Sequence, residues 1–279
     1  MKQWARVLGV VLLILNISCQ KPRDNPVDPG GTTYEPPKID SFSPSLDLFT
    51  SNTLTFEWQS NSGGIEYRYR LEDSIAVAVD ELIDYTSMNR VTFELLDDGL
   101  YRFSVYVRHV GRTEFRTYER QFRVMAITGP ILKFVKLKSS AQLNSQTNVA
   151  VWIQDVDQFS SVSMKIRFDN AKINLKTVLA GDFVSPPDGF SQLIVPDFSD
   201  NSVLSAANTS GTINVAAVVL AGKSTGTAIS GSMPILNFVF RGTEKGSSDL
   251  EIVEFELRDP TNKLIQINGR PQKARVVIN

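Results

Sequence analysis

The sequence predicts an all-β protein made of two β-sandwiches. Three observations lead to this fold class: short segments in which apolar and polar residues alternate, Gly, Asn, Asp, Ser and Pro residues that separate them, and the lack of a long amphipathic helical pattern. The chain has 279 residues, which is more than one small sandwich needs, so two domains are expected.

Residues 1–18 have the layout of a secretory signal peptide. Lys2 and Arg6 give a positive start, and residues 7–15 form an apolar run that ends before small and polar residues. A basic start, an apolar core and a small-residue exit are typical of such a peptide. The run is shorter than the roughly 20 residues that cross a bilayer, so we expect export without a permanent transmembrane helix.

Cys19 is the one cysteine of the chain and directly follows this segment. A lone cysteine in an exported protein has no internal disulfide partner. Its position after Leu15-Asn16-Ile17-Ser18 resembles the lipobox of bacterial lipoproteins, although Asn16 stands where Leu is usual. The resemblance implies lipidation of Cys19 and an anchor in the outer membrane or at the cell surface. The alternative is an ordinary signal peptide with an incidental cysteine.

Residues 19–37 form, in this interpretation, the lipidated cysteine and a flexible tether. The segment is rich in Pro, Gly, Asn and Asp and has almost no apolar content. Such a composition cannot offset the entropy lost on ordering, so we expect an extended and mobile spacer. A spacer of this kind suits a module displayed away from a membrane.

Residues 38–127 are expected to form an Ig/fibronectin III-like sandwich. Alternation marks strands at residues 54–58, 67–71, 91–95 and 101–107. Asp97-Asp98-Gly99 predicts a turn before the last of these, and Trp58 lies on an early strand, where such folds bury a tryptophan. Residues 98–108 resemble the Asp-Gly-x-Tyr-x-Phe-x-Val strand of fibronectin III-like repeats. Residues 75–88 fit either a strand with a loop or a short helix.

Residues 130–279 are expected to form the second sandwich, after a boundary at Ile127-Thr128-Gly129-Pro130. Alternation marks strands at residues 131–137, 148–153, 161–168, 212–220, 233–240, 250–257 and 274–278. The loops between them are rich in Gly, Ser and Asn, and Asp259-Pro260-Thr261-Asn262 is a turn signal.

The second unit resembles the cohesin family. The resemblance is carried, in order, by residues 162–169, 173–178, Ala180-Gly181-Asp182-Phe183, 211–216, 231–240 and 257–265. It implies a nine-stranded jelly-roll sandwich of the cohesin and carbohydrate-binding-module superfamily. Classical cohesins bind dockerin domains through one sheet face. Interface residues vary widely within the family, so the resemblance assigns none here.

The residue content argues against most classes of enzyme. His109 is the one histidine, and Cys19 is assigned to the lipid, so Cys–His catalysis and multi-histidine metal sites are excluded. His109 follows Val105 and Val107 on one strand face, which favours a partly buried structural histidine. We therefore expect no catalytic residues, no metal and no cofactor. A glycoside hydrolase needs two carboxylates and stays as a third, less favoured hypothesis.

Trp152 is the candidate ligand-binding residue. In Val149-Ala150-Val151-Trp152-Ile153 the three β-branched residues share one face, so the indole points to the other. If the first face is the core, the indole lies exposed on a sheet, where it can stack on a sugar. The alternative is that Trp152 packs under a loop or against the first domain. The same question applies to Tyr67, Tyr69, Tyr101 and Tyr106.

Two groups of oxygen-bearing side chains are candidates for a calcium site. Asp155 and Asp157 share one side of a strand end, and Asp197, Asp200 and Asn201 lie in a long loop. Neither has the spacing of an EF-hand, which favours ordinary surface charge and no metal.

The leading functional hypothesis is a surface-anchored lipoprotein that acts as a binding or scaffolding module. Its cohesin-like domain would contact a protein partner, with a dockerin-like domain as the candidate, while the lipid contacts the membrane. The alternative is a carbohydrate-binding module in polysaccharide capture and catabolism. The formal net charge of −1 gives no sign of the concentrated basic surface that a nucleic-acid partner needs, so we expect no such partner.

Overall fold

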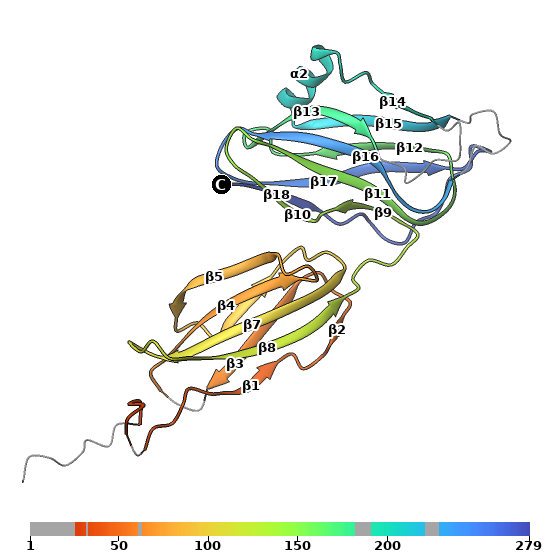
Figure 1. Ribbon diagram of the computed structural model, residues 1–279. Helices are drawn as coiled ribbons and strands as arrows, with labels where there is room; N and C mark the ends of the chain where they lie inside the picture. Colours follow the sequence, from red (N-terminus) through yellow and green to blue (C-terminus); the bar gives the residue numbers. More distant parts are fainter. Residues whose placement is uncertain (1–25, 32, 61–62, 182–190, 221–228) are drawn as a thin grey trace, which may run out of the picture.

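The computed structural model describes residues 26–31, 33–60, 63–181, 191–220 and 229–279, and within these ranges it is all-β apart from one helix (Figure 1). The predicted signal peptide, Cys19 and the Asp182-Phe183 part of the cohesin-like pattern lie outside the described residues. None of the helical residues described here forms an apolar stretch that could cross a bilayer.

The N-terminal unit, strands β1 to β8, consists of two sheets around one core. The three-stranded sheet has the order β1-β3-β6, and the five-stranded sheet has the order β2-β8-β7-β4-β5. The strands are β1 (Ile39–Ser43), β2 (Leu48–Phe49), β3 (Leu54–Ser60), β4 (Ile65–Asp73), β5 (Ala78–Thr86), β6 (Arg90–Phe93), β7 (Gly99–His109) and β8 (Phe115–Val124). The four predicted strands are present, and the ambiguous residues 75–88 contain strand β5.

The core of the N-terminal unit is aromatic. Phe56 and Trp58 point inward from β3 and meet Phe103 of β7, with 4.8 Å between the ring centroids of Phe56 and Phe103. Alternation along each strand sends these rings to one side and the polar residues to the other. Trp58 is 1% exposed, as its place on an early strand predicts.

The C-terminal unit, strands β9 to β18, also has two sheets. One has the order β10-β18-β17-β12-β15-β14, and the other has the order β13-β16-β11-β9. The strands are β9 (Ile131–Val135), β10 (Lys138–Ala141), β11 (Gln146–Phe159), β12 (Ser161–Arg167), β13 (Ile173–Ala180), β14 (Ser191–Val195), β15 (Thr212–Leu220), β16 (Ile229–Gly242), β17 (Gly246–Arg258) and β18 (Ala274–Ile278). All seven predicted strands are present.

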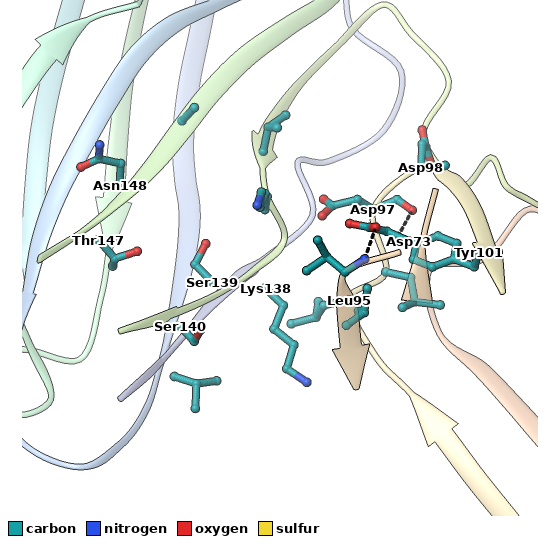
Figure 2. Close-up of a pocket in the computed structure, with 18 of the residues that line it drawn as sticks. Asp73, Leu95, Asp97, Asp98, Tyr101, Lys138, Ser139, Ser140, Thr147 and Asn148 are labelled. Atoms are coloured by element: carbon teal, nitrogen blue, oxygen red, sulfur yellow. Dashed lines mark hydrogen bonds between the residues drawn. The ribbon is translucent and has the colours of Figure 1, made fainter. Parts of the chain in front are cut away.

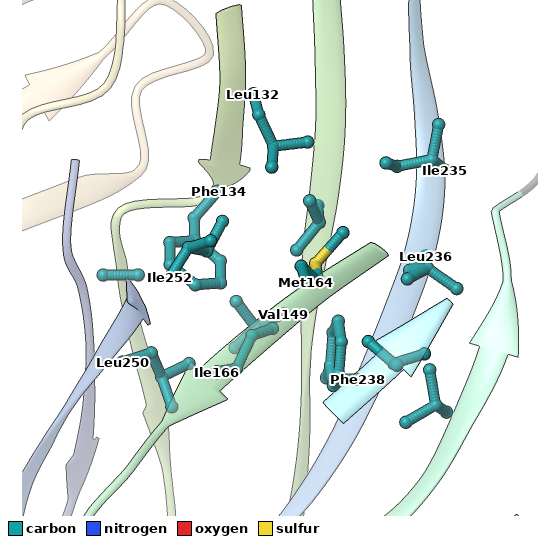
Figure 3. Packing of buried hydrophobic residues seen from close by; sticks show 14 of the residues in the cluster. Leu132, Phe134, Val149, Met164, Ile166, Ile235, Leu236, Phe238, Leu250 and Ile252 are labelled. Carbon is teal, nitrogen blue, oxygen red and sulfur yellow. The ribbon is translucent and has the colours of Figure 1, made fainter. Parts of the chain in front are cut away.

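The core of the C-terminal unit is mainly aliphatic and lies between its two sheets (Figure 3). Met164 and Ile166 of β12 pack from one sheet, and Val149 and Phe238 pack from the other. Because every second residue of these strands is buried, the intervening residues form two outward sheet faces.

The sequence predicts one long loop that contains Asp197, Asp200 and Asn201. Helix α2 (Asn201–Ser210) corrects this expectation for Asn201, which begins the helix, and for Asp200, which caps it, whereas Asp197 lies in the loop before it. Asp200 caps the helix by accepting a hydrogen bond from the Ser202 amide at 2.8 Å. Gly211 ends it with a φ of 66°, and its amide donates to the Ala207 carbonyl at 2.9 Å. Asp before the helix and Gly after it are ordinary cap residues, so this signal was present in the sequence.

Candidate functional site

The outer face of the six-stranded sheet carries a charged and polar lattice, called the charged face here. It consists of Ser163, Lys165, Asn214, Ala216, Glu254 and Glu256, which border a surface hollow of about 580 Å³. The register of β12 with its neighbours β15 and β17 arranges these residues in rows across the strands. Ser163 lies between Ala216 and Glu256, and Lys165 lies between Asn214 and Glu254. Lys165 Nζ and Glu254 Oε1 are 3.4 Å apart.

The outer face of the four-stranded sheet has a different composition. Trp152 points to this face, as the alternation along β11 predicts, since Val149, Val151 and Ile153 are fully buried on the other side. The indole is half-buried rather than fully exposed. In the register, Trp152 lies opposite Pro234 and Lys133, and Ala150 lies opposite Asn237 and Val135. The indole is therefore a surface group on this sheet.

A cleft between the two units opens onto this face. It has a volume of about 1150 Å³ and includes Trp152 in its lining. Figure 2 shows the two walls: Thr147 and Asn148 come from the C-terminal unit, and Leu95 and Tyr101 come from the N-terminal unit. Trp152 thus lines a cleft whose opposite wall comes from the first unit.

Asp97 joins the two units, whereas the neighbouring Asp98 bonds to the end of the N-terminal unit. Asp97 Oδ1 accepts a hydrogen bond from the Leu137 amide at 2.8 Å, and Asp98 Oδ1 accepts one from the Ala126 amide at 2.7 Å. Burial raises the pKa of Asp97, although the Leu137 hydrogen bond opposes this effect. The predicted Asp97-Asp98-Gly99 turn therefore also joins the domains, which the sequence did not reveal.

Further contacts cross the same boundary. Asn52 Nδ2 donates to Gln272 Oε1 at 2.7 Å, and Arg275 and Glu94 form an ion pair at 3.2 Å. At Gly129, in the predicted boundary, a Cβ atom would lie 2.6 Å from the Gln154 carbonyl oxygen, so only glycine allows this close approach. The linker is therefore packed against the C-terminal unit.

His109 is buried, with 3% of its surface exposed. Its Nε2 lies 2.9 Å from the Glu35 carbonyl oxygen, and its ring meets Tyr34 edge-on. Because Pro37 is also buried, the last residues of the predicted tether pack on the N-terminal unit. The expectation of a mobile spacer over all of residues 19–37 is therefore wrong at this end.

The four tyrosines that the sequence analysis considered together with Trp152 do not form an exposed aromatic strip. Tyr67 and Tyr101 are buried, and Tyr69 packs against the aromatic core. Burial raises the pKa of all three. Tyr106 is half-buried beneath Arg68, whose guanidinium carbon lies 4.6 Å from the ring centroid.

The candidate calcium groups have local partners. Asp155 Oδ1 lies 3.2 Å from Ser232 Oγ, and Asp157 Oδ1 lies 2.5 Å from Ser230 Oγ. Asp197 accepts a hydrogen bond from the Ser199 amide, and such bonds lower the pKa of Asp197 and of the capping Asp200. Among the described residues, no three His, Cys, Asp or Glu side chains gather in a way that could hold a metal ion.

Comparison with known proteins gives matches among solved structures alone, since no family model and no curated protein matches this sequence. A non-cellulosomal cohesin from Archaeoglobus fulgidus matches with 16% identity and a TM-score of 0.38, over 55% of this chain and 92% of that one. A type II cohesin from the cellulosome of Acetivibrio cellulolyticus matches with 14% identity and a TM-score of 0.39, over 52% and 93%.

A third similar structure is a type I cohesin–dockerin complex from Clostridium thermocellum. It matches with 16% identity and a TM-score of 0.36, over 53% of this chain and 99% of that one. About half of this chain is thus similar to cohesin domains. At these values the likenesses carry no information about partner or activity, which depend on the residues themselves.

Proposed function

We propose that this chain is a surface-anchored lipoprotein whose cohesin-like domain binds a protein partner through the charged face. The observation that carries the proposal is the regular lattice of Ser163, Lys165, Asn214, Ala216, Glu254 and Glu256 on an exposed sheet face. Non-obligate protein interfaces are about as polar as the rest of a protein surface, so a mixed polar and charged face suits such an interface.

The chemistry of the charged face favours a protein over a sugar. Among the described residues around its hollow, the one aromatic residue is Phe255, which is half-buried and packs against the core, so these residues offer no stacking platform. Lys165, Glu254 and Glu256 instead supply charges of both signs, which select a partner with the complementary pattern. The cohesin in the similar structure from Clostridium thermocellum is in complex with a dockerin, so a dockerin-like domain is the first partner to test.

Export and lipidation are part of the same proposal. They are supported by the basic start, the apolar run and the position of Cys19 in the sequence. Labelling cells with a fatty acid analogue should mark the wild-type protein and not Cys19→Ala. Equal labelling of the two would contradict the lipid anchor.

The N-terminal unit is proposed to be an Ig/fibronectin III-like spacer. Its strongest support is Tyr101 near the start of β7, whose hydroxyl donates to the Asp97 carbonyl at 2.8 Å. A tyrosine at this place, bonded to the backbone a few residues upstream, is a recurring feature of immunoglobulin-type sandwiches.

The test of partner binding uses two matched alanines. Ala216 is half-buried in the middle of the charged face, and Ala150 is half-buried in the middle of the opposite face. Immobilised full-length protein should capture a dockerin-like protein from the source cells, identified by mass spectrometry. Ala216→Arg should abolish this capture and Ala150→Arg should not. Equal capture by both variants would contradict the proposed face.

A further inference from the structure

We infer that the interdomain cleft binds a neutral oligosaccharide, with the indole of Trp152 as the stacking platform and the amides of Asn148 and Asn237 as hydrogen-bonding groups. This site is independent of the charged face, which belongs to the other sheet. One molecule would then carry a protein partner on one face and a glycan beside the other.

Trp152 has the exposure that a stacking group needs. From Pro130 onward, the half-buried aromatic residues in the described part of the chain are Trp152 and Phe255, and Phe255 packs against the core. Trp152 instead lines the cleft, with three fully buried residues of β11 fixing its strand behind it. An indole on a rigid sheet offers an apolar face to the C–H side of a sugar ring.

The polar groups beside Trp152 suit sugar hydroxyls. Asn148 is exposed, and its side chain has no hydrogen-bond partner among the described residues. The amide of Asn237 makes one long contact, 3.4 Å to the Ala180 carbonyl oxygen. Each asparagine offers a donor and an acceptor, which matches a hydroxyl that can do both.

The spacing along β11 leaves room for more than one ring. Asn148, Ala150 and Trp152 point to the same side at successive two-residue steps, each of about 6.6 Å at the rise of a strand. Because the side chain of Ala150 is small, it leaves space for a sugar ring between the indole of Trp152 and the amide of Asn148. The cleft volume of about 1150 Å³ exceeds that of most small-molecule sites, about 300–1,000 Å³, so an oligosaccharide fits better than a single sugar.

The charges in the cleft favour a neutral ligand. The charged residues that line the cleft are two lysines and three aspartates: Lys136, Lys138, Asp73, Asp97 and Asp98. Lys138 is 3.5 Å from Asp80, and the carboxylates of Asp97 and Asp98 accept backbone hydrogen bonds. The lining therefore carries no excess of positive charge that would attract an acidic sugar or a phosphate.

The wall from the N-terminal unit completes the site. Val77 and Leu100 are 54% and 55% exposed and line the cleft, so they can cover the C–H surface of a bound chain. The hydrogen bond from the Leu137 amide to Asp97 joins this wall to the C-terminal unit before any ligand arrives. A preorganised site between two domains is where ligands commonly bind, and rigidity reduces the entropy lost on binding.

The test uses purified full-length protein and six neutral polysaccharides: laminarin, xylan, galactomannan, arabinan, amylopectin and hydroxyethyl cellulose. Affinity gel electrophoresis identifies binders, and titration calorimetry gives the affinities. We expect saturable binding to at least one of the six. Trp152→Ala and Asn148→Ala should each weaken it at least tenfold, and Trp152→Phe should retain most of it.

The controls separate this site from the proposed protein interface. Ala216→Arg on the charged face should leave polysaccharide binding unchanged, whereas Ala150→Arg should abolish it. No saturable binding to any of the six, unchanged binding in Trp152→Ala, or tighter binding of anionic polygalacturonate would each overturn the inference. Capture of a protein that Ala150→Arg alone abolishes would also overturn it, because the cleft would then be a protein site.

Discussion

The two outer faces of the C-terminal unit share a geometry and differ in chemistry. Both lie over the same aliphatic core, and both have a half-buried alanine in a middle strand. The charged face surrounds Ala216 with Lys165, Glu254 and Glu256, while the opposite face surrounds Ala150 with Trp152 and two asparagines. The sandwich therefore fixes which residues point outward, and residue type alone gives each face its binding chemistry.

The second difference lies in what adjoins each face. The face of Trp152 borders the N-terminal unit, and the cleft of about 1150 Å³ forms there. The hollow on the charged face is about half as large and is lined by residues of the C-terminal unit alone. A domain boundary thus turns one of two similar sheets into a walled site, while the other stays an open surface.

The largest expected effect is a reciprocal loss of binding in the two alanine variants. An arginine placed on either face blocks the contact of that face with its ligand and leaves the other sheet unaltered. Ala216→Arg should weaken protein binding, and Ala150→Arg polysaccharide binding, each by on the order of 100-fold, or about 2.7 kcal/mol. Calorimetric titration measures both affinities. Loss of both activities in one variant would show that the two faces are not independent.

Removing the carboxylate of Asp97 should have the next largest effect. Leu137 is fully buried, and Asp97→Ala deprives its amide of an acceptor, which costs about 1–3 kcal/mol of stability. The cleft should lose polysaccharide affinity because its wall is no longer held, while protein binding at the charged face should persist. Urea unfolding and the two binding assays measure these effects. Unchanged stability would show that the interdomain hydrogen bond contributes nothing.

Much of the fold was readable in the sequence because alternation is a local property. The strands around Trp58 and Trp152 were placed correctly, and the inward side of each was identified from its β-branched and aromatic residues. Helix α2 was missed because its ten residues carry a weak apolar pattern, although Asp200 and Gly211 gave the cap signals.

The sites were less readable because they depend on contacts between distant segments. Lys165 and Asn214 were each predictable as outward residues, but their pairing follows from strand register, which the sequence leaves open. The cleft requires Trp152 to face a wall that contains Leu100, and nothing in either segment indicates the other. The outward direction of Trp152 was predictable because one indole among β-branched residues is a local signal.

A change of pH should alter the stability of the protein through Asp97, which lines the cleft. Its pKa is raised by burial, so the folded protein holds this proton more tightly than the unfolded chain does. The stability from Asp97 is therefore complete below its ordinary pKa and is lost as the pH rises through the raised value. Asp97→Asn keeps an oxygen acceptor for Leu137 and cannot ionise.

The stability of wild-type protein relative to Asp97→Asn should therefore fall as the pH rises from acid to neutral. Urea unfolding of both proteins across this range measures the difference, which cancels the titration of all other groups. A difference that stays constant, or that changes in the opposite direction, would contradict the burial of this carboxylate at the domain boundary.

The smallest effect is expected at the ion pair of the charged face. Lys165 and Glu254 are 35% and 73% exposed, so Glu254→Gln should change stability by less than about 1 kcal/mol. It should still alter the association rate of a charged partner at low salt, an effect that added salt screens. Glu244→Gln, which removes the exposed pair with Lys172 elsewhere on the same domain, is the matched control. Stopped-flow association at two salt concentrations should separate the variants. Equal rates would show that the partner does not approach over Lys165 and Glu254.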